Sequence, residues 1–334
     1  MSREFLDENQ RRNIPLYDYY EEEVVADNAN VPSVAAGAAP PPSTPGFLAP
    51  TSTAPDAGKF MCCVSTDDLV SWVDIPDILS QDLQTLSHRG MYAVSMRDRA
   101  RIEEFAIIRE FVDWLTSPRS SQLLIEGDYS PLAYMSGLSH FCVSLERVLA
   151  RRAPRSIPLV FFCGLHTELL GDAHTGGRAL VQSFIRQLLD YIKRYQLSSF
   201  NGGGIPLPSW AIPSIRAGDL SALCVLFESL VRFLPSGVAL YCLVDGVAFF
   251  EGDGFLEDLT RVLEPILQLS RQRETDASLK LLLTSPTFTL EMHRWFPLQS
   301  RLSMGGMRGG GPIANSERLE QELASALQVE DGEQ

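Results

Sequence analysis

The chain has 334 residues, of which 45% are hydrophobic and 21% are charged, which is the composition of an ordinary globular protein. No apolar run approaches the roughly 20 residues that a membrane span needs. The polar, acidic N-terminus lacks the apolar core of a signal peptide. We therefore expect a cytoplasmic or nuclear protein that is neither secreted nor bound to a membrane.

The net charge of −14 is concentrated at the two ends of the sequence. Residues 1 to 57 hold nine acidic residues against three arginines, and residues 312 to 334 hold six against Arg318. The segment between them is close to neutral and carries no basic patch, so nucleic acid is not an expected partner.

The six cysteines and five histidines do not form the spacings of a metal site. Four cysteines lie in apolar runs, and Cys62 and Cys63 are adjacent, so we interpret all six as reduced thiols. Cys163 and His166 stand close together at the end of an apolar run, and a buried cysteine is favoured there over a nucleophile. The sequence predicts no bound metal, unless Asp245 holds Mg²⁺.

The order of segments predicts one α/β domain with flanking regions. Residues 1–57 are rich in Pro and Ala and predict an acidic, disordered tail. Residues 58–121 predict a helical lead-in, with a helix that Thr66 or Asp67 caps and a stronger one from about 97 to 116. Residues 122–300 predict the α/β domain, and residues 301–334 predict a Gly-rich linker followed by an amphipathic helix from about 316 to 328.

Within the α/β domain, apolar runs alternate with helical periodicity. Four strands are predicted, at Gln122–Glu126, Pro158–Cys163, Val238–Val244 and Leu279–Thr284. Helices are predicted at about 136–150, 178–196, 219–233 and 256–272. Because each strand is apolar on both faces, we expect a mostly parallel sheet between two helical layers, a three-layer α/β/α fold.

A nucleotide would bind at the carboxyl ends of such strands. The first strand ends at Gly127, and Gly137-Leu138-Ser139 opens the next helix, in the order strand, loop, helix that is typical of a phosphate-binding loop. The loop is longer than that motif allows and its lysine position holds Leu138. Asp245 ends the third strand, where an acid holds Mg²⁺ in nucleotide hydrolases. A turn former is the alternative for Asp245, since Gly246 follows it.

The chain resembles the NACHT-type branch of the STAND P-loop NTPases, especially degenerate NACHT-like proteins common in filamentous fungi. The resemblance covers roughly residues 100 to 290. It is carried by short blocks in the same order: Trp114-Leu115, Ser117, Ser120-Ser121, Leu123 to Ile125, Gly127, Ser136 to Ser139, Phe161 to Gly164 with His166, Gln187 to Leu189, Asp245-Gly246 and Leu281 to Pro286.

The resemblance also implies three losses relative to active NACHT domains. Leu138 stands at the lysine position, Val247 to Phe249 replace the catalytic acids, and Pro286 replaces a sensor arginine. All three groups stabilise charge in phosphoryl transfer.

The expected function is therefore a non-catalytic regulatory or scaffold protein with protein partners and no required cofactor. The alternative is a weak or binding-only ATPase or GTPase that uses Mg²⁺, Asp245 and loop amides. The nucleotide site, which is vestigial in the first case and occupied in the second, would comprise Gly127, Gly137, Ser139 and Asp245.

Overall fold

A computed structural model describes residues 60–73, 76–130, 134–168, 174–197, 204–252, 254–272, 277–309 and 316–331. The acidic tail predicted over residues 1–57 lies outside this described part of the chain. All statements below concern the described residues.

The centre of the fold is a five-stranded, wholly parallel sheet. Its strands are β2 (Ser121–Glu126), β3 (Ser156–Phe162), β5 (Ala239–Asp245), β6 (Ser278–Ser285) and β7 (Arg301–Ser303). Their spatial order is β3-β5-β6-β2-β7, which places β2 inside the sheet between β6 and β7. The four predicted strands are confirmed. The fifth, β7, is only three residues long and has no apolar run, so no pattern predicted it.

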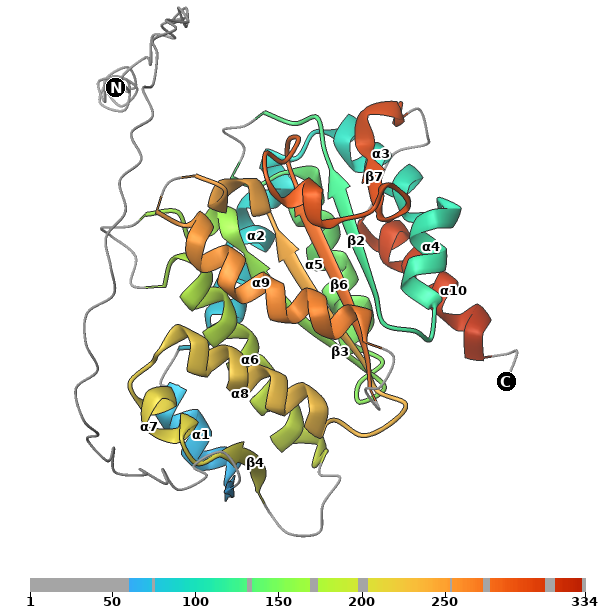
Figure 1. The fold of residues 1–334 in the computed structure, drawn as a ribbon. Helices are drawn as coiled ribbons and strands as arrows, with labels where there is room; N and C mark the ends of the chain where they lie inside the picture. The colour runs from blue at the N-terminus through green and yellow to red at the C-terminus, as the bar shows by residue number, and fades with distance from the viewer. Residues whose placement is uncertain are drawn as a thin grey trace, which may run out of the picture. The chain divides into compact units, whose positions relative to one another are not determined.

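Helices cover both faces of this sheet, which confirms the three-layer α/β/α fold. In Figure 1, α9 lies in front of the sheet and α5 lies behind it. The front layer consists of α6 (Gly176–Tyr195), α8 (Leu220–Phe233) and α9 (Leu256–Arg271). The back layer consists of α3 (Met96–Ala106), α4 (Arg109–Thr116), α5 (Gly137–Ala150) and α10 (Ser316–Asp331). None of the described helices is long and apolar enough to cross a membrane.

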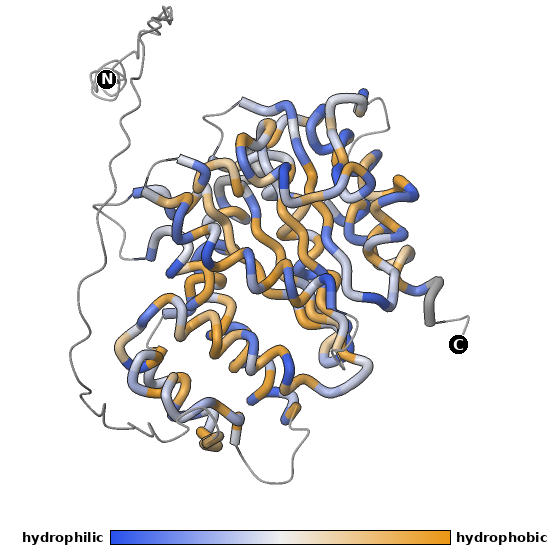
Figure 2. Tube along the Cα trace, viewed as in Figure 1, coloured by the Kyte–Doolittle hydropathy of each residue, from blue (hydrophilic) through white to orange (hydrophobic). Residues whose placement is uncertain are grey.

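Alternation along the strands divides the core into two clusters, one on each face of the sheet. In β2, Leu124 packs with the front layer, whereas Leu123 and Ile125 pack with the back layer. Successive side chains of a strand point to opposite faces, so a strand that is apolar throughout serves both clusters. Figure 2 shows the strands hydrophobic along most of their length and the helices hydrophobic on part of their surface.

The helix predicted from about 97 to 116 is in fact two helices. Ile107 is the C-cap of α3, and the backbone leaves helical geometry at Ile108, which is the extended N-cap of α4. In a continuous helix Phe105 and Phe111 would point about 120° apart. The break instead allows both rings to contact Phe141 of α5, with ring centroids 5.6 and 5.2 Å away. Tertiary packing therefore outweighs local helical periodicity here.

A second, two-stranded antiparallel sheet lies outside the main one. It pairs β1 (Met61–Val64) with β4 (Ile205–Pro208). Along the chain, β1 is followed by α1 (Thr66–Val73) and α2 (Ile78–Ala93), and β4 is followed by α7 (Ala211–Arg216). Ser65 caps α1 by accepting a hydrogen bond from the Asp68 N–H, so the predicted caps Thr66 and Asp67 are wrong by one or two residues.

Two buried carboxylates fix the segment that connects β6 to β7. Glu126, at the end of β2, accepts hydrogen bonds from the N–H and the hydroxyl of Thr289 at 2.9 and 2.8 Å. Glu251 accepts three backbone N–H groups, from Leu290, Glu291 and Met292, at 2.7 to 2.9 Å. The Glu251 side chain is buried, and it caps the 3₁₀ helix Met292–Trp295.

Replacement of Glu251 by Ala should therefore destabilise the fold. Three backbone donors would lose their acceptor, one of them buried, and we expect the free energy of unfolding to fall by roughly 2–4 kcal/mol. Urea denaturation followed by circular dichroism would measure the change. Glu257→Ala is the matched control, because that side chain is 88% exposed at the start of α9 and its loss should matter little. Equal effects of the two substitutions would contradict the capping role of Glu251.

Candidate functional site

The four residues predicted for a nucleotide site converge at the carboxyl edge of the sheet. Gly127 follows β2, Gly137 and Ser139 open α5, and Asp245 ends β5. β6 lies between β2 and β5, and its last residues, Thr284 and Ser285, border the same place. This is the edge at which ligands bind in open α/β sheets.

Asp245 is buried and bonded to the protein itself. It accepts a hydrogen bond from the Thr284 hydroxyl at 2.6 Å and another from the Ser139 hydroxyl. Burial raises the pKa of Asp245 from 3.8 to about 6, and the hydrogen bonds from Ser139, Thr284 and the Gly246 backbone oppose that rise. The carboxylate that would hold Mg²⁺ thus already has hydroxyl partners from two neighbouring elements.

The N-terminus of α5 is likewise occupied by side chains of the chain. Ser136 and Ser139 form a capping box, in which the Ser136 hydroxyl accepts from the Leu138 N–H at 3.1 Å. The Ser139 hydroxyl accepts from the Ser136 N–H at 3.0 Å. These donors are the groups that a phosphate would otherwise use at a helix N-terminus. Leu138, at the lysine position, is completely buried in the back core cluster.

The side chain of Tyr129 fills the space between the two glycines. A Cβ atom at Gly127 would lie 2.5 Å from Cδ2 of Tyr129, and one at Gly137 would lie 2.6 Å from its Oη. Real Cβ atoms do not approach other atoms so closely, so both positions need glycine while the ring is there. The hydroxyl is buried without a hydrogen-bond partner among the described residues, and burial raises the pKa of Tyr129 well above its usual range.

Two backbone N–H groups at the start of the loop after β2 donate hydrogen bonds to the end of β6, so they are not free to bind a phosphate. The Gly127 N–H donates to the carbonyl of Ser285 at 2.8 Å, and the Tyr129 N–H donates to the carbonyl of Pro286 at 2.9 Å. Farther along, the Tyr134 ring stacks on Phe249, with centroids 5.3 Å apart. The loop is thus anchored beyond β6 at one end and beyond β5 at the other, across the carboxyl edge of the sheet.

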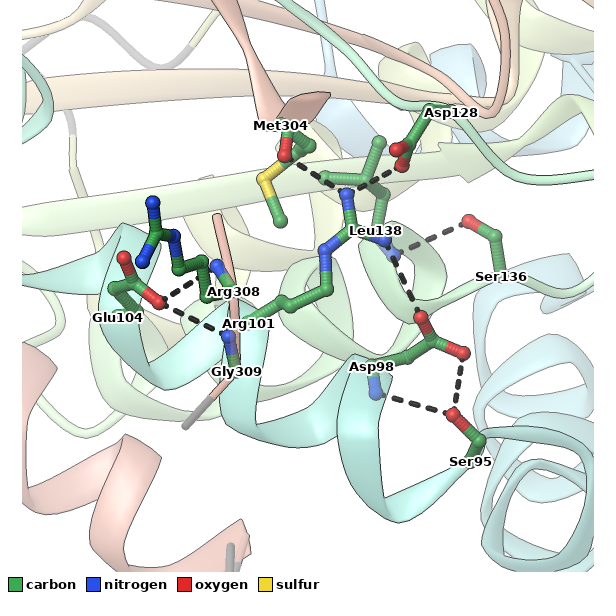
Figure 3. A network of polar contacts seen from close by, with 10 residues as sticks. All are labelled: Ser95, Asp98, Arg101, Glu104, Asp128, Ser136, Leu138, Met304, Arg308 and Gly309. Atoms are coloured by element: carbon green, nitrogen blue, oxygen red, sulfur yellow. Dashed lines mark hydrogen bonds and ion pairs between the residues drawn. The ribbon is translucent and has the colours of Figure 1, made fainter. Parts of the chain in front are cut away.

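Arg101 of α3 holds the beginning of this loop from the back layer. Its guanidinium forms an ion pair with Asp128 and donates to the carbonyl of Met304 at 2.8 Å, as Figure 3 shows. Its carbon Cζ lies 5.4 Å from the centre of the Tyr129 ring. Because its side chain is only 8% exposed, this charge is almost fully committed to the protein's own groups.

A cavity of about 220 Å³ borders the start of α5 on the side of α2. Ser136, Ser139 and His140 line it together with Leu86 and Met135, among others. Ligand pockets usually measure about 300–1,000 Å³, so this space is small for a nucleotide.

The other chemical groups weighed in the sequence do not form a reactive centre here. Cys163 is completely buried, and burial raises the pKa of its thiol well above the ordinary value. The imidazole of His166 contacts Asp82 of α2 at 3.1 Å and stacks on Phe161. Among the described residues, no group of three or more His, Cys, Asp or Glu could hold a metal ion.

Sequence reasoning missed the residues that determine the state of this edge. Tyr129 lies in an aperiodic loop, and Arg101 is one of several charged residues on a helix, so neither has a distinctive local pattern. The signal that pointed in their direction was the excess length of the loop between Gly127 and Gly137.

The raised pKa of Asp245 predicts a specific dependence of stability on pH. The folded state binds more protons than the unfolded state between about pH 4 and 6, so the free energy of unfolding should decrease as pH rises through that window. The contribution is on the order of 2–3 kcal/mol. Asp245→Asn should remove this decrease, which chemical denaturation at several pH values would reveal.

The control for this experiment is Asp113→Asn. That change removes the same charge from a side chain that is 67% exposed on α4. It should leave the decrease between pH 4 and 6 in place, and a pH profile of Asp245→Asn identical to that of the native chain would contradict the assignment.

Comparison with known proteins found no relative. No protein-family model matches the chain, no curated protein matches it, and no solved structure matches it. The interpretation of the carboxyl edge therefore depends on its own geometry.

Proposed function

We propose that this chain is a non-catalytic regulatory or scaffold protein, built on a degenerate NACHT-like P-loop fold whose phosphate position is closed by its own loop. On this proposal the protein acts through protein partners in the cytoplasm or nucleus and does not hydrolyse ATP or GTP.

The observation that carries the proposal is the position of the Tyr129 ring. It lies against Gly127 and Gly137, the two residues that would line a phosphate-binding loop. A phosphate at the start of α5 would have to displace this ring and the hydroxyls of Ser136 and Ser139.

The charges around the edge support the same conclusion. Phosphoryl transfer needs cations and an acid placed to stabilise developing charge. Of the cations at this edge, Arg101 is paired with Asp128, and Arg301 lies 3.7 Å from Glu126. The acid, Asp245, is bonded to Ser139 and Thr284. Leu138 supplies no charge at the lysine position, and Val247, after Asp245-Gly246, is buried and apolar.

Titration with fluorescent ATP and GTP, with and without Mg²⁺, tests the proposal. We expect no saturable binding up to about millimolar nucleotide and no phosphate release above background. Tyr129→Phe should behave in the same way, since the ring remains, and it should fold at least as stably because the unpartnered buried hydroxyl is gone.

Tyr129→Ala is the informative partner of that control, because it empties the space between the glycines. Weak nucleotide binding in this variant alone would identify the ring as the obstacle. Micromolar, Mg²⁺-dependent binding to the native chain that Asp245→Ala abolishes would instead establish the binding-only alternative. Phosphate release that Asp245→Ala abolishes would refute the proposal.

A further inference from the structure

The small β1–β4 sheet has a hydrogen-bonding pattern that its prolines define. The N–H of Ser209 donates to the carbonyl of Phe60 at 2.9 Å, just beyond the Met61↔Pro208 pair. In an antiparallel ladder, hydrogen-bonded pairs alternate with non-hydrogen-bonded ones. The Cys62↔Leu207 pair is therefore hydrogen-bonded. Met61 and Cys63 lie opposite Pro208 and Pro206, and they direct their N–H and C=O groups away from β4.

The two outer edges of this sheet differ as a result. On β4, the outward positions are Pro206 and Pro208, which have no N–H to offer another strand. Prolines of this kind are a common protection of edge strands. On β1, the outward positions are Met61 and Cys63, whose backbone N–H and C=O groups have no hydrogen-bond partner among the described residues. No other described strand pairs with that side of β1.

The surroundings of the β1 edge are exposed and apolar. Phe60 and Met61 are 73% and 58% exposed, and Cys62 and Cys63 are exposed free thiols. Residues 60–64 carry no charge, in a chain whose net charge is −14. Two copies can therefore bring these strands together without placing like charges opposite each other, which would be destabilising.

We propose that β1 is a self-pairing edge, which joins antiparallel to β1 of a second copy of this chain around a two-fold axis. An antiparallel pair of identical strands is self-complementary by symmetry. The register that uses every outward donor places Met61 opposite Cys63 of the second copy, and the reverse. Its centre is Cys62 opposite Cys62, in a non-hydrogen-bonded pair.

In this register, Cys62 can form a disulfide between the two copies and Cys63 cannot. Opposite residues of a non-hydrogen-bonded pair have Cα atoms about 4.5 Å apart, within the range of disulfides. The two Cys63 residues lie diagonally across the pair, with Cα atoms about 8 Å apart by the same strand geometry, which is beyond disulfide reach.

The strength of the dimer follows from the size of the contact. A four-residue strand with its neighbouring side chains buries less than the roughly 1,200 Å² of a typical stable interface. The dimer is therefore a weak one that depends on protein concentration. It is independent of the closed nucleotide edge, which lies on the other sheet.

Thiol cross-linking tests the register. Diamide takes up two electrons and two protons from two thiols as their disulfide forms, and is itself reduced to the hydrazine. We expect a cross-linked dimer from the native chain and from Cys63→Ser, which also removes the competing reaction with the adjacent thiol. Cys62→Ser should lose it by at least tenfold. Equal cross-linking in the two variants, or no dimer in Cys63→Ser, would overturn the register.

Sedimentation velocity in reducing buffer tests the pairing itself. Met61→Pro removes an outward N–H without touching the ladder to β4, and should weaken dimerisation about tenfold or more. Met61→Leu keeps the N–H and should dimerise like the native chain, and thermal melts would verify that both variants fold. A dimer unaffected by Met61→Pro would overturn the proposal.

A third measurement, thiol alkylation, distinguishes self-pairing from an edge that another segment of the same chain covers. Iodoacetamide should alkylate Cys62 readily at low protein concentration and more slowly at high concentration. A chain that stays monomeric at all concentrations, with Cys62 protected throughout, would show that another segment of the same chain covers the edge, and this would overturn self-pairing.

Discussion

The ring of Tyr129 can lie over the carboxyl edge of the sheet only because Gly127 and Gly137 have no Cβ atoms. A side chain at either position would overlap the ring, so the two glycines and the tyrosine form one steric unit. Glycine at the end of a strand and at the start of a helix is usually explained by the close approach of a ligand. Here the same freedom serves a side chain of the protein.

The acidic side chains at this edge are likewise hydrogen-bonded to other groups of the protein. Glu126 and Glu251 accept hydrogen bonds from the segment after β6, and Asp245 accepts hydrogen bonds from hydroxyl groups of β6 and α5. A buried carboxylate is costly unless it accepts several hydrogen bonds. These acids therefore stabilise the folded state by fixing the loops around them. A ligand that used the same carboxylates would have to displace hydroxyl and N–H groups of the protein itself.

Much of the fold could be predicted from the sequence, because the strands that cross the core are apolar on both faces. A continuous run of apolar residues, such as the one around Leu282, indicates a central parallel strand from the sequence alone. The division at Ile107–Ile108 could not be predicted, since it depends on the contact of Phe105 and Phe111 with Phe141. Strand β7 could not be predicted either, because its three residues form a strand only by pairing with β2.

The candidate site could be predicted only in part. Motif spacing located Asp245 and Ser139. Tyr129 and Arg101 could not be located in this way, because their roles depend on contacts between segments that are distant in sequence.

A crystal structure determined in the presence of millimolar Mg²⁺ and a non-hydrolysable ATP analogue would test directly whether Tyr129 closes the phosphate position. We expect clear density for the Tyr129 ring between Gly127 and Gly137, an Asp245–Thr284 hydrogen bond, and no nucleotide at the start of α5. Triphosphate density against the N-terminus of α5, with Tyr129 displaced and Mg²⁺ beside Asp245, would contradict this expectation.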